Sequence, residues 1–229
     1  RRAGMLRVMT TEELFDAVAT LAGAQRIRGD RLVILTNGGG PGVMATDALI
    51  ERQGHLAALS AATIEKLNTI LPPTWSHGNP VDIIGDAPAD RYVQTLEILL
   101  EDNNSDAILF IHAPTAIVPS SDIASEVAPI VKSAGLDMLA CWLGGDSVAQ
   151  ARRTFSDAGI PTYHTPEDAV SGFMQVVQYR RNQALLMEVP PSASGEAIPD
   201  GEKARSIIRQ VLAEGRSMLS EVEAKNLLM

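Results

Sequence analysis

The sequence is poor in aromatic residues, basic residues and cysteine, and it has no long apolar run. No uninterrupted apolar stretch among the 229 residues approaches the length of a membrane span, so no membrane partner is expected. The formal net charge of −9 argues against a general nucleic-acid surface. The single cysteine, Cys141, excludes an intrachain disulfide, and its apolar neighbours favour a buried structural thiol over a nucleophile. With no signal peptide in view, these features predict a globular, cytoplasmic protein.

What the sequence does contain is an apolar strand that runs into glycines and then into a helix of small residues, RLVILTNGGGPGVMATDAL at 31–49. Glycines let a ligand approach the backbone, and a helix that begins there directs free N–H groups and its positive dipole end at that ligand. Pro41 is expected at the first helical position. The pattern predicts a phosphate site, or else a tight turn with no ligand. The candidate phosphate-binding residues are Asn37, Gly38, Gly39, Gly40, Gly42 and Val43.

Several known kinds of phosphate site are excluded by residues that this loop lacks. A Walker loop ends in Gly-Lys-Ser/Thr, whereas Gly42 is followed by Val43 and Met44. A dinucleotide site needs an acid after the second strand, and residues 60–62 hold none, so NAD is not expected. The loop also lacks the hydroxyl and aromatic side chains of an FMN site. The remaining interpretation is a helix N-terminus that meets a phosphate carried by a partner group.

Strands alternate with helices along residues 25–187, which predicts a parallel sheet covered by helices on both faces. We expect an α/β, flavodoxin-like three-layer fold with strand order 2-1-3-4-5, counting strands at 32–35, 56–59, 107–111, 138–143 and 161–164. The glycine-loop helix is expected at 42–53 and the last helix of this part at 169–187. Ligands bind such sheets beyond the carboxyl ends of the strands. The possible site edge there comprises Asp82, Asp86, His112, Gly144 and Gly145.

The two ends of the chain differ from this alternating body. Residues 1–24 are expected to form a leading helix, and residues 25–187 the flavodoxin-like domain. Residues 188–201 are rich in proline, glycine and serine, which predicts a linker. Residues 202–229 are expected to open a further domain, because a helix is followed there by a capped second helix that stops in mid-pattern. The chain is therefore expected to be part of a longer protein.

Four segments carry a family resemblance. They are TNGGGPGV at 36–43 with DAL at 47–49, NPVDIIGD at 79–86, LGGDSV at 143–148, and AGIPTY at 158–163 with PE at 166–167. In order and spacing they resemble the ligase-CoA region of NDP-forming acyl-CoA synthetases, the succinyl-CoA synthetase superfamily. The resemblance covers about residues 5–180, and residues 215–228 resemble the lead-in to that family's ATP-grasp domain. Together with residues 1–7 and 179–183, the chain also resembles the synthetase-like part of Pat-type protein lysine acetyltransferases.

The resemblance implies a parent protein that is an acetate–CoA ligase of the ADP-forming type or an acetyltransferase-fused homologue. Such a parent uses ATP or ADP, Mg²⁺ and CoA. In the family, a phosphorylated histidine carries phosphate between the CoA and ATP-grasp parts, and the glycine-loop helix receives it. That histidine belongs to a preceding domain, in a Ser-His-Thr-Gly setting that this sequence lacks. The expected partners are therefore the CoA-binding, phosphohistidine and ATP-grasp domains of the same polypeptide, and an oligomer is possible.

The resemblance assigns no catalytic residue, metal ligand or cofactor to this chain, which is expected to be inactive alone. His112 is the one histidine whose place at the strand ends makes it a functional candidate, and Asp86 is alternatively a cap for the next helix. Replacing Gly42 with valine is expected to block the approach of phosphate. The alternative function is that of a non-catalytic ligand-sensing or assembly module of a Pat-type protein.

Overall fold

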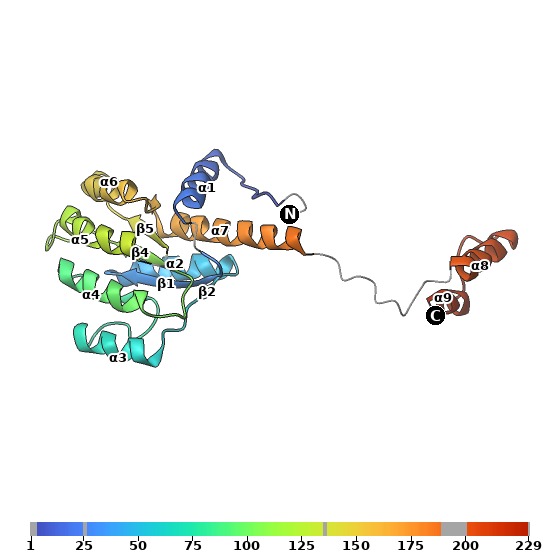
Figure 1. Cartoon of the computed structure of the whole chain (residues 1–229), viewed down its shortest axis with the longest axis horizontal. Helices are drawn as coiled ribbons and strands as arrows, with labels where there is room; N and C mark the ends of the chain where they lie inside the picture. Colours follow the sequence, from blue (N-terminus) through green and yellow to red (C-terminus); the bar gives the residue numbers. More distant parts are fainter. Residues whose placement is uncertain (1–3, 25–26, 135–136, 189–200, 229) are drawn as a thin grey trace. The chain divides into compact units, whose positions relative to one another are not determined.

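The computed structural model describes residues 4–24, 27–134, 137–188 and 201–228. By its internal contacts the chain divides into two units, Arg1–Met187 and Glu188–Met229. The first unit holds the sheet and its covering helices, and the second holds two helices (Figure 1). The predicted linker, residues 188–201, falls almost wholly outside the described residues.

The first unit is built on a parallel sheet. Its strands are β1 (Arg31–Thr36), β2 (His55–Leu56), β3 (Val81–Asp82), β4 (Ala107–His112), β5 (Met138–Trp142) and β6 (Thr162–Tyr163). The strand order is β2-β1-β4-β5-β6, which confirms the predicted 2-1-3-4-5 because β4, β5 and β6 are the expected third, fourth and fifth strands. The fold is thus the expected three-layer α/β type. The short strand β3, which pairs with β1, was not predicted.

Helices cover both faces of this sheet. They are α1 (Thr11–Gly23), α2 (Gly39–Glu51), α3 (Ala61–Ile70), α4 (Ala89–Leu100), α5 (Ser120–Ser133), α6 (Ala149–Asp157) and α7 (Pro166–Met187), with a short 3₁₀ turn, η1 (Gly145–Val148). One apolar core joins the sheet to α3, α4, α5 and α6, and includes Phe110 and Trp142. The other joins it to α2 and α7, and includes Leu49 and Phe173. Helix α1 packs beside α7 (Figure 1).

The edge of β1 is shared by two short strands. The first residues of β1 pair with β2, through Arg31 and His55, and its last residues pair with β3, through Thr36 and Asp82. Asn79 fills the interval between them. Its Oδ1 accepts from the N–H of Ile34 at 2.9 Å, and its Nδ2 donates to the carbonyls of Leu32 and Ala57. A side-chain amide here replaces the backbone groups of a missing strand.

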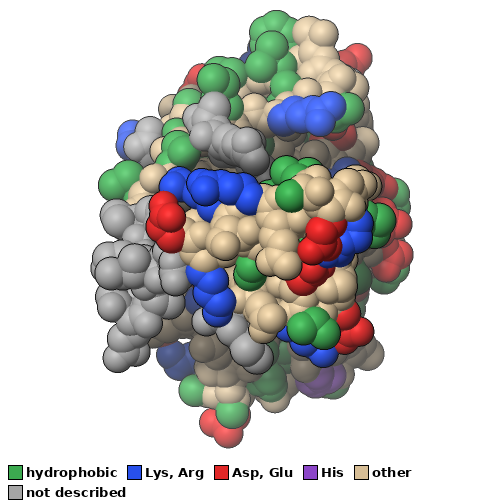
Figure 2. Space-filling model, turned by 90° about the vertical axis from the view of Figure 1, so that its right-hand side faces the viewer, with side chains coloured by type: hydrophobic (Ala, Val, Ile, Leu, Met, Phe, Trp, Pro, Cys, Tyr) green, Lys and Arg blue, Asp and Glu red, His purple; other side chains and the backbone are tan. Residues whose placement is uncertain are grey.

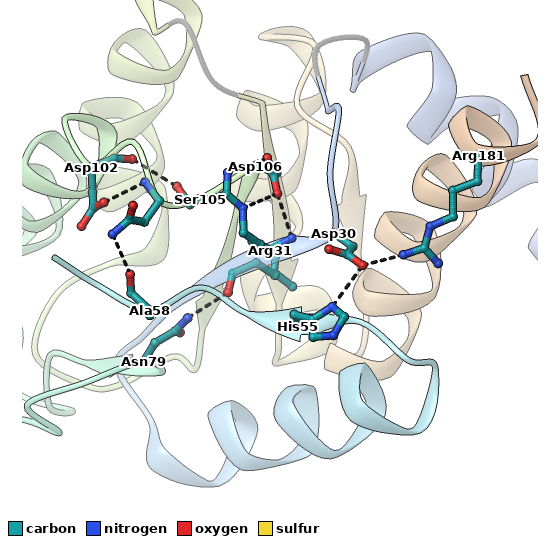
Figure 3. A network of polar contacts seen from close by, with 11 residues as sticks. Asp30, Arg31, His55, Ala58, Asn79, Asp102, Ser105, Asp106 and Arg181 are labelled. Atoms are coloured by element: carbon teal, nitrogen blue, oxygen red, sulfur yellow. Dashed lines mark hydrogen bonds and ion pairs between the residues drawn. The ribbon is translucent and has the colours of Figure 1, made fainter. Parts of the chain in front are cut away.

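Ion pairs fasten the amino ends of the strands (Figure 3). The guanidinium of Arg31 makes two hydrogen bonds to the carboxylate of Asp106, which lies just before β4. This arginine holds the pKa of Asp106 below its usual value. The carboxylate of Asp30 accepts from His55 of β2 and from Arg181 of α7. The edge of the sheet opposite the glycine loop is therefore tied together electrostatically.

The second unit contains α8 (Gly201–Ala213) and α9 (Glu221–Leu228). Arg216, between the two helices, donates to the carboxylates of Glu214 and Glu223. The N–H of Ser220 donates to Glu223, and the N–H of Glu223 donates to the hydroxyl of Ser220, a reciprocal capping box that begins α9. This capped helix start was expected from the sequence.

On the face shown in Figure 2, acidic and basic side chains lie interspersed and form no large patch of one sign. Within the described part of the chain, no helix is long and apolar enough to cross a membrane.

Candidate functional site

The carboxyl end of β1 leads into the glycine loop through a turn that Thr36 closes. The Thr36 hydroxyl accepts from the N–H of Gly38 at 3.0 Å and also lies 3.0 Å from the Gly38 carbonyl oxygen, to which it can donate. Thr36 is fully buried, so this turn is fixed from below by the core. Gly38 takes an extended conformation (φ −143°, ψ 120°) and acts as the N-cap of α2.

The side chain of Asn37 is buried and has a structural role. Its side-chain amide donates to the carbonyl of Ala113 and its Oδ1 accepts from the N–H of Ala113, both at 2.8 Å. This pair of bonds joins the ends of β1 and β4 in the manner of one further ladder step. Asn37 is 3% exposed. Both polar ends of this amide are already engaged, so the predicted phosphate contact of Asn37, which stays a prediction, would not come from its side chain.

Helix α2 begins at Gly39, three residues earlier than predicted, so Pro41 is its third residue rather than its first. The N–H of Gly42 donates to the Gly38 carbonyl at 3.3 Å, which is the first bond of the helix. The amides that precede it in the helix and carry a hydrogen are those of Gly39 and Gly40, because Pro41 has none. Both glycines are exposed, and Gly38 provides no side-chain cap. In the described residues no hydrogen bond from these two amides is found, so they are the groups of the loop that are available to a ligand.

Gly42 is buried, and its lack of a side chain allows α2 to pack closely against Thr36 and Pro80. A Cβ placed on it would lie 3.1 Å from the Cγ2 of Thr36 and 3.4 Å from the Cβ of Pro80. Its φ is not in the left-handed region, and neither are those of Gly38, Gly39 and Gly40, so no glycine of this loop is required by a positive φ. A valine at this position would press on the core beneath the loop instead of reaching upward to the phosphate. Val43 is 59% exposed on the outer side of α2.

The carboxylate of Asp82 lies beside the first turn of α2. A Cβ on Gly39 would be 3.2 Å from Asp82 Oδ2, while Asp82 Oδ1 accepts from the N–H of Ile84 at 2.9 Å. Asp82 belongs to β3, whose start is held by the hydroxyl of Ser76. The structure thus brings Asp82 to the glycine loop as predicted from sequence. A carboxylate there competes with any anion for the positive end of the helix.

Asp86 lies outside this cluster. It forms an ion pair with Arg91 at 2.6 Å, and Arg91 also donates to the carbonyl of Ile83. Its carboxylate does not cap α4, whose N-cap is Pro88 without a side-chain bond. The alternative role predicted for Asp86 as a helix cap is therefore wrong.

His112 ends β4 beneath the surface. Its Nδ1 lies 3.0 Å from the hydroxyl of Tyr92 and its Nε2 3.0 Å from the hydroxyl of Ser120. Its ring also packs against Trp142, with 5.0 Å between ring centroids. Burial lowers its pKa to about 4, so the imidazole is neutral near pH 7. With 1% exposure and both nitrogens bonded, His112 is a structural residue rather than a reacting one.

Gly144 and Gly145 form the turn after β5, and both have positive φ, 114° and 58°. A Cβ on Gly144 would also lie 2.7 Å from the Cγ of Pro114. The positive φ favours glycine at both positions, and at Gly144 the loop after β4 lies too close for a side chain to fit. Since Ala113 is bonded to Asn37, the three loops form one continuous edge. No hydrogen bond in the described residues joins Gly144 or Gly145 directly to Gly39 or Gly40.

Three residues that sequence reasoning missed shape this edge: Thr36, Ser76 and Asn79. Each is a short polar residue next to a strand end, where side chains bond to nearby backbone. Cys141, in contrast, was correctly predicted as structural. It is fully buried, and burial raises the pKa of its thiol to about 12.

The family model of the ligase-CoA domain matches residues 32–191. The chain belongs to the ligase-CoA domain family. It is 35% identical over 215 residues to "Acetate--CoA ligase [ADP-forming] I" of Archaeoglobus fulgidus, covering 94% of this chain and 30% of that protein. It is 34% identical to "Acetate--CoA ligase [ADP-forming] II subunit alpha" of Pyrococcus furiosus, covering 80% of this chain and 40% of that subunit.

Solved structures agree with this assignment. "Ca. Korarchaeum cryptofilum dinucleotide forming Acetyl-coenzyme A synthetase 1 in complex with phosphate and ADP" superposes with a TM-score of 0.77 and 30% identity, over 82% of this chain and 42% of that one. The chain therefore spans 30–42% of the length of the three proteins compared here. The predicted membership of the acyl-CoA synthetase superfamily is confirmed. The likeness to Pat-type acetyltransferases stays a prediction.

Proposed function

We propose that this chain is the ligase-CoA part of an ADP-forming acid–CoA ligase, and that α2 docks the phosphate of a phosphohistidine supplied by another part of that enzyme. The observation that carries the proposal is the pair of exposed, uncapped amides of Gly39 and Gly40 at the end of β1. ATP, Mg²⁺ and CoA would be held by the other parts. Alone, the chain would turn over no substrate.

The local chemistry favours weak, reversible binding of phosphate over a permanent phosphate site. Two backbone N–H groups and the helix dipole favour an anion by on the order of 1 kcal/mol when exposed. The carboxylate of Asp82 opposes this attraction from beside Gly39. A carrier histidine has to leave after each transfer, so weak docking is compatible with a relay.

Variants at Gly39 and Asp82 test the docking site. Gly39→Pro removes one amide hydrogen at the first helical position, where proline is tolerated, and the extended Gly38 before it suits a following proline. Gly39→Ala is the matched control, because it adds a Cβ and keeps the N–H. Asp82→Asn removes the competing charge and retains an Oδ1 acceptor for Ile84.

Phosphate is titrated into the 229-residue chain while the amide resonance of Gly40 is followed. We expect the apparent Kd to rise about threefold in Gly39→Pro, to stay unchanged in Gly39→Ala, and to fall about threefold in Asp82→Asn, each change being below 1 kcal/mol. In the intact ligase, Gly39→Pro should slow ATP-dependent phosphorylation of the histidine and acetate-dependent thioester formation. Equal behaviour of Gly39→Pro and Gly39→Ala, with unchanged thermal unfolding, would remove the helix end from the mechanism.

A further inference from the structure

Helix α1 is apolar on the side that faces away from the domain. Its inner side packs on α7, and the helix also lies next to α6 (Figure 1). Phe15 is 69% exposed and Val18 is 61% exposed. A helix that is hydrophobic all round is normally buried, and exposed apolar patches mark interaction surfaces. Among residues 14–22, all of which the structure describes, every exposed side chain is apolar: Leu14, Phe15, Val18, Ala19 and Ala22.

The orientation of α1 about its own axis is fixed by a buried pair of hydroxyl groups. The hydroxyl of Thr20 donates to the carbonyl of Asp16 at 2.6 Å and accepts from the hydroxyl of Tyr163 in β6. Thr20 is fully buried and Tyr163 is 3% exposed. Turning α1 to bury its apolar outer face would break the bond to Tyr163 and leave a buried hydroxyl without its partner. The apolar outer face of α1 is therefore a fixed feature of the surface.

A hollow of about 400 Å³ continues this face toward α6. A Cβ built on Gly159 would meet no atom within 4 Å, so the hollow is open at that point. The first half of the outer face thus carries large apolar side chains, and the second half borders an uncharged hollow. The residues that line the hollow are Ala19, Ala22 and Gly23 of α1, together with Ser156, Gly159, Ile160, Pro161 and Thr162.

The large and the small residues of α1 are placed so that the outer face fits a second copy of itself. We consider two copies of the helix that run antiparallel about a two-fold axis between residues 18 and 19. Phe15 of each copy then lies level with Ala22 of the other, and Val18 lies level with Ala19. Each pair joins a large side chain to a small one, so side chains of one helix fit between those of the other. A two-fold interface uses the same patch on both copies, which this face allows.

We propose that the chain forms a dimer in which α1 packs antiparallel against α1 of a second copy. The side chain of Phe15 from each copy would enter the hollow beside Ala22 of the other copy. Two chains of net charge −9 can meet here without a direct like-charge contact, because the exposed side chains of residues 14–22 are uncharged. An unrelated partner would require no match between the two halves of one helix. This surface shares no residue with the glycine loop and does not depend on the proposed function.

Sedimentation velocity of the 229-residue chain over a range of protein concentrations tests the proposal. We expect a monomer–dimer equilibrium that strengthens as salt is added, because salt screens the repulsion between two acidic copies while the contact itself is apolar. Phe15→Lys and Ala22→Asp should each weaken the dimer about tenfold or more. An equimolar mixture of these two variants should dimerise more tightly than either alone, because the mixed dimer joins the ammonium to the carboxylate and keeps one native contact.

Ile117→Lys is the matched control, since Ile117 is 58% exposed but lies on the loop before α5. It introduces the same charge as Phe15→Lys and should leave the dimer unchanged. Equal weakening by Ile117→Lys would overturn the proposal, as would a mixture of Phe15→Lys and Ala22→Asp that dimerises no better than either variant alone.

Disulfide formation tests the antiparallel register. Val18→Cys places two thiols next to the two-fold axis, whereas the thiols of Ala22→Cys would lie about 10 Å apart along the helix axis, which a disulfide cannot span. The natural Cys141 is fully buried and does not interfere. We expect a covalent dimer from Val18→Cys and none from Ala22→Cys. Equal cross-linking of the two variants, or a chain that stays monomeric at every concentration, would overturn the proposal.

Discussion

At the scale of single residues, His112 couples the stability of the domain to pH. Its pKa is lowered from 6.5 to about 4 by burial. Between these two pH values the imidazole is protonated in the unfolded chain and neutral in the folded chain. Stability is therefore fully present above the unfolded pKa and is lost as the pH falls toward the folded pKa. Between pH 7 and pH 5 we expect the free energy of unfolding to fall by about 2 kcal/mol from this group.

Urea unfolding at the two pH values measures this effect. The variant His112→Gln keeps a polar side chain between Tyr92 and Ser120 but cannot titrate. Its stability should be lower at pH 7 and should vary less between the two pH values, by the same 2 kcal/mol or so. An identical pH dependence in both proteins would mean that the imidazole of His112 is protonated while the protein is folded.

At the scale of elements, Asn79 holds the interrupted edge of the sheet together. Asn79→Ala would leave the buried N–H of Ile34 and the carbonyls of Leu32 and Ala57 without their partner. We expect a loss of about 2–4 kcal/mol in the free energy of unfolding and faster hydrogen exchange at Ile34. Asn79→Asp is the matched control, since a carboxylate still accepts from Ile34 but cannot donate to the carbonyls. A change under about 0.5 kcal/mol in Asn79→Ala would contradict this role.

The interrupted edge of β1 also shows which parts of the sheet could be predicted from the sequence and which could not. The long apolar runs of β1, β4 and β5 were recognisable because buried parallel strands are continuous hydrophobic segments. The strand order 2-1-3-4-5 followed from the flavodoxin-like doubly wound arrangement expected for alternating strands and helices. Strand β3 has two residues and follows a proline, so it carries no periodic signal. Its partner contacts arise from tertiary structure, through Asn79 and Ser76, and are not visible in local sequence.

The glycine loop shows how far the sequence could predict local detail. Glycines after a buried strand correctly indicated that a helix begins there, although α2 starts three residues earlier than predicted. Which glycine has a free amide depends on where the helix begins, and helix boundaries are poorly fixed by sequence. Gly42 was therefore included among the predicted phosphate-binding residues with Gly39 and Gly40, although its N–H already donates to Gly38. Likewise, the position of His112 at a strand end was correct, but its burial depends on Tyr92, Ser120 and Trp142 from other elements.

At the scale of the whole molecule, both apolar cores lie within residues 24–177, and neither includes a residue of the second unit. Deleting residues 188–229 should therefore leave the urea midpoint of the first unit unchanged, with a difference below about 0.5 kcal/mol in unfolding free energy. The composition of residues 190–202 further predicts that limited proteolysis cuts there first and leaves the first unit intact. A large drop in stability on deletion would show that the second unit supports the first. An early cut near Trp75–Asn79 that released two stable halves would contradict the single sheet, because β3 and Asn79 lie on the far side of that cut from β1, with which they bond.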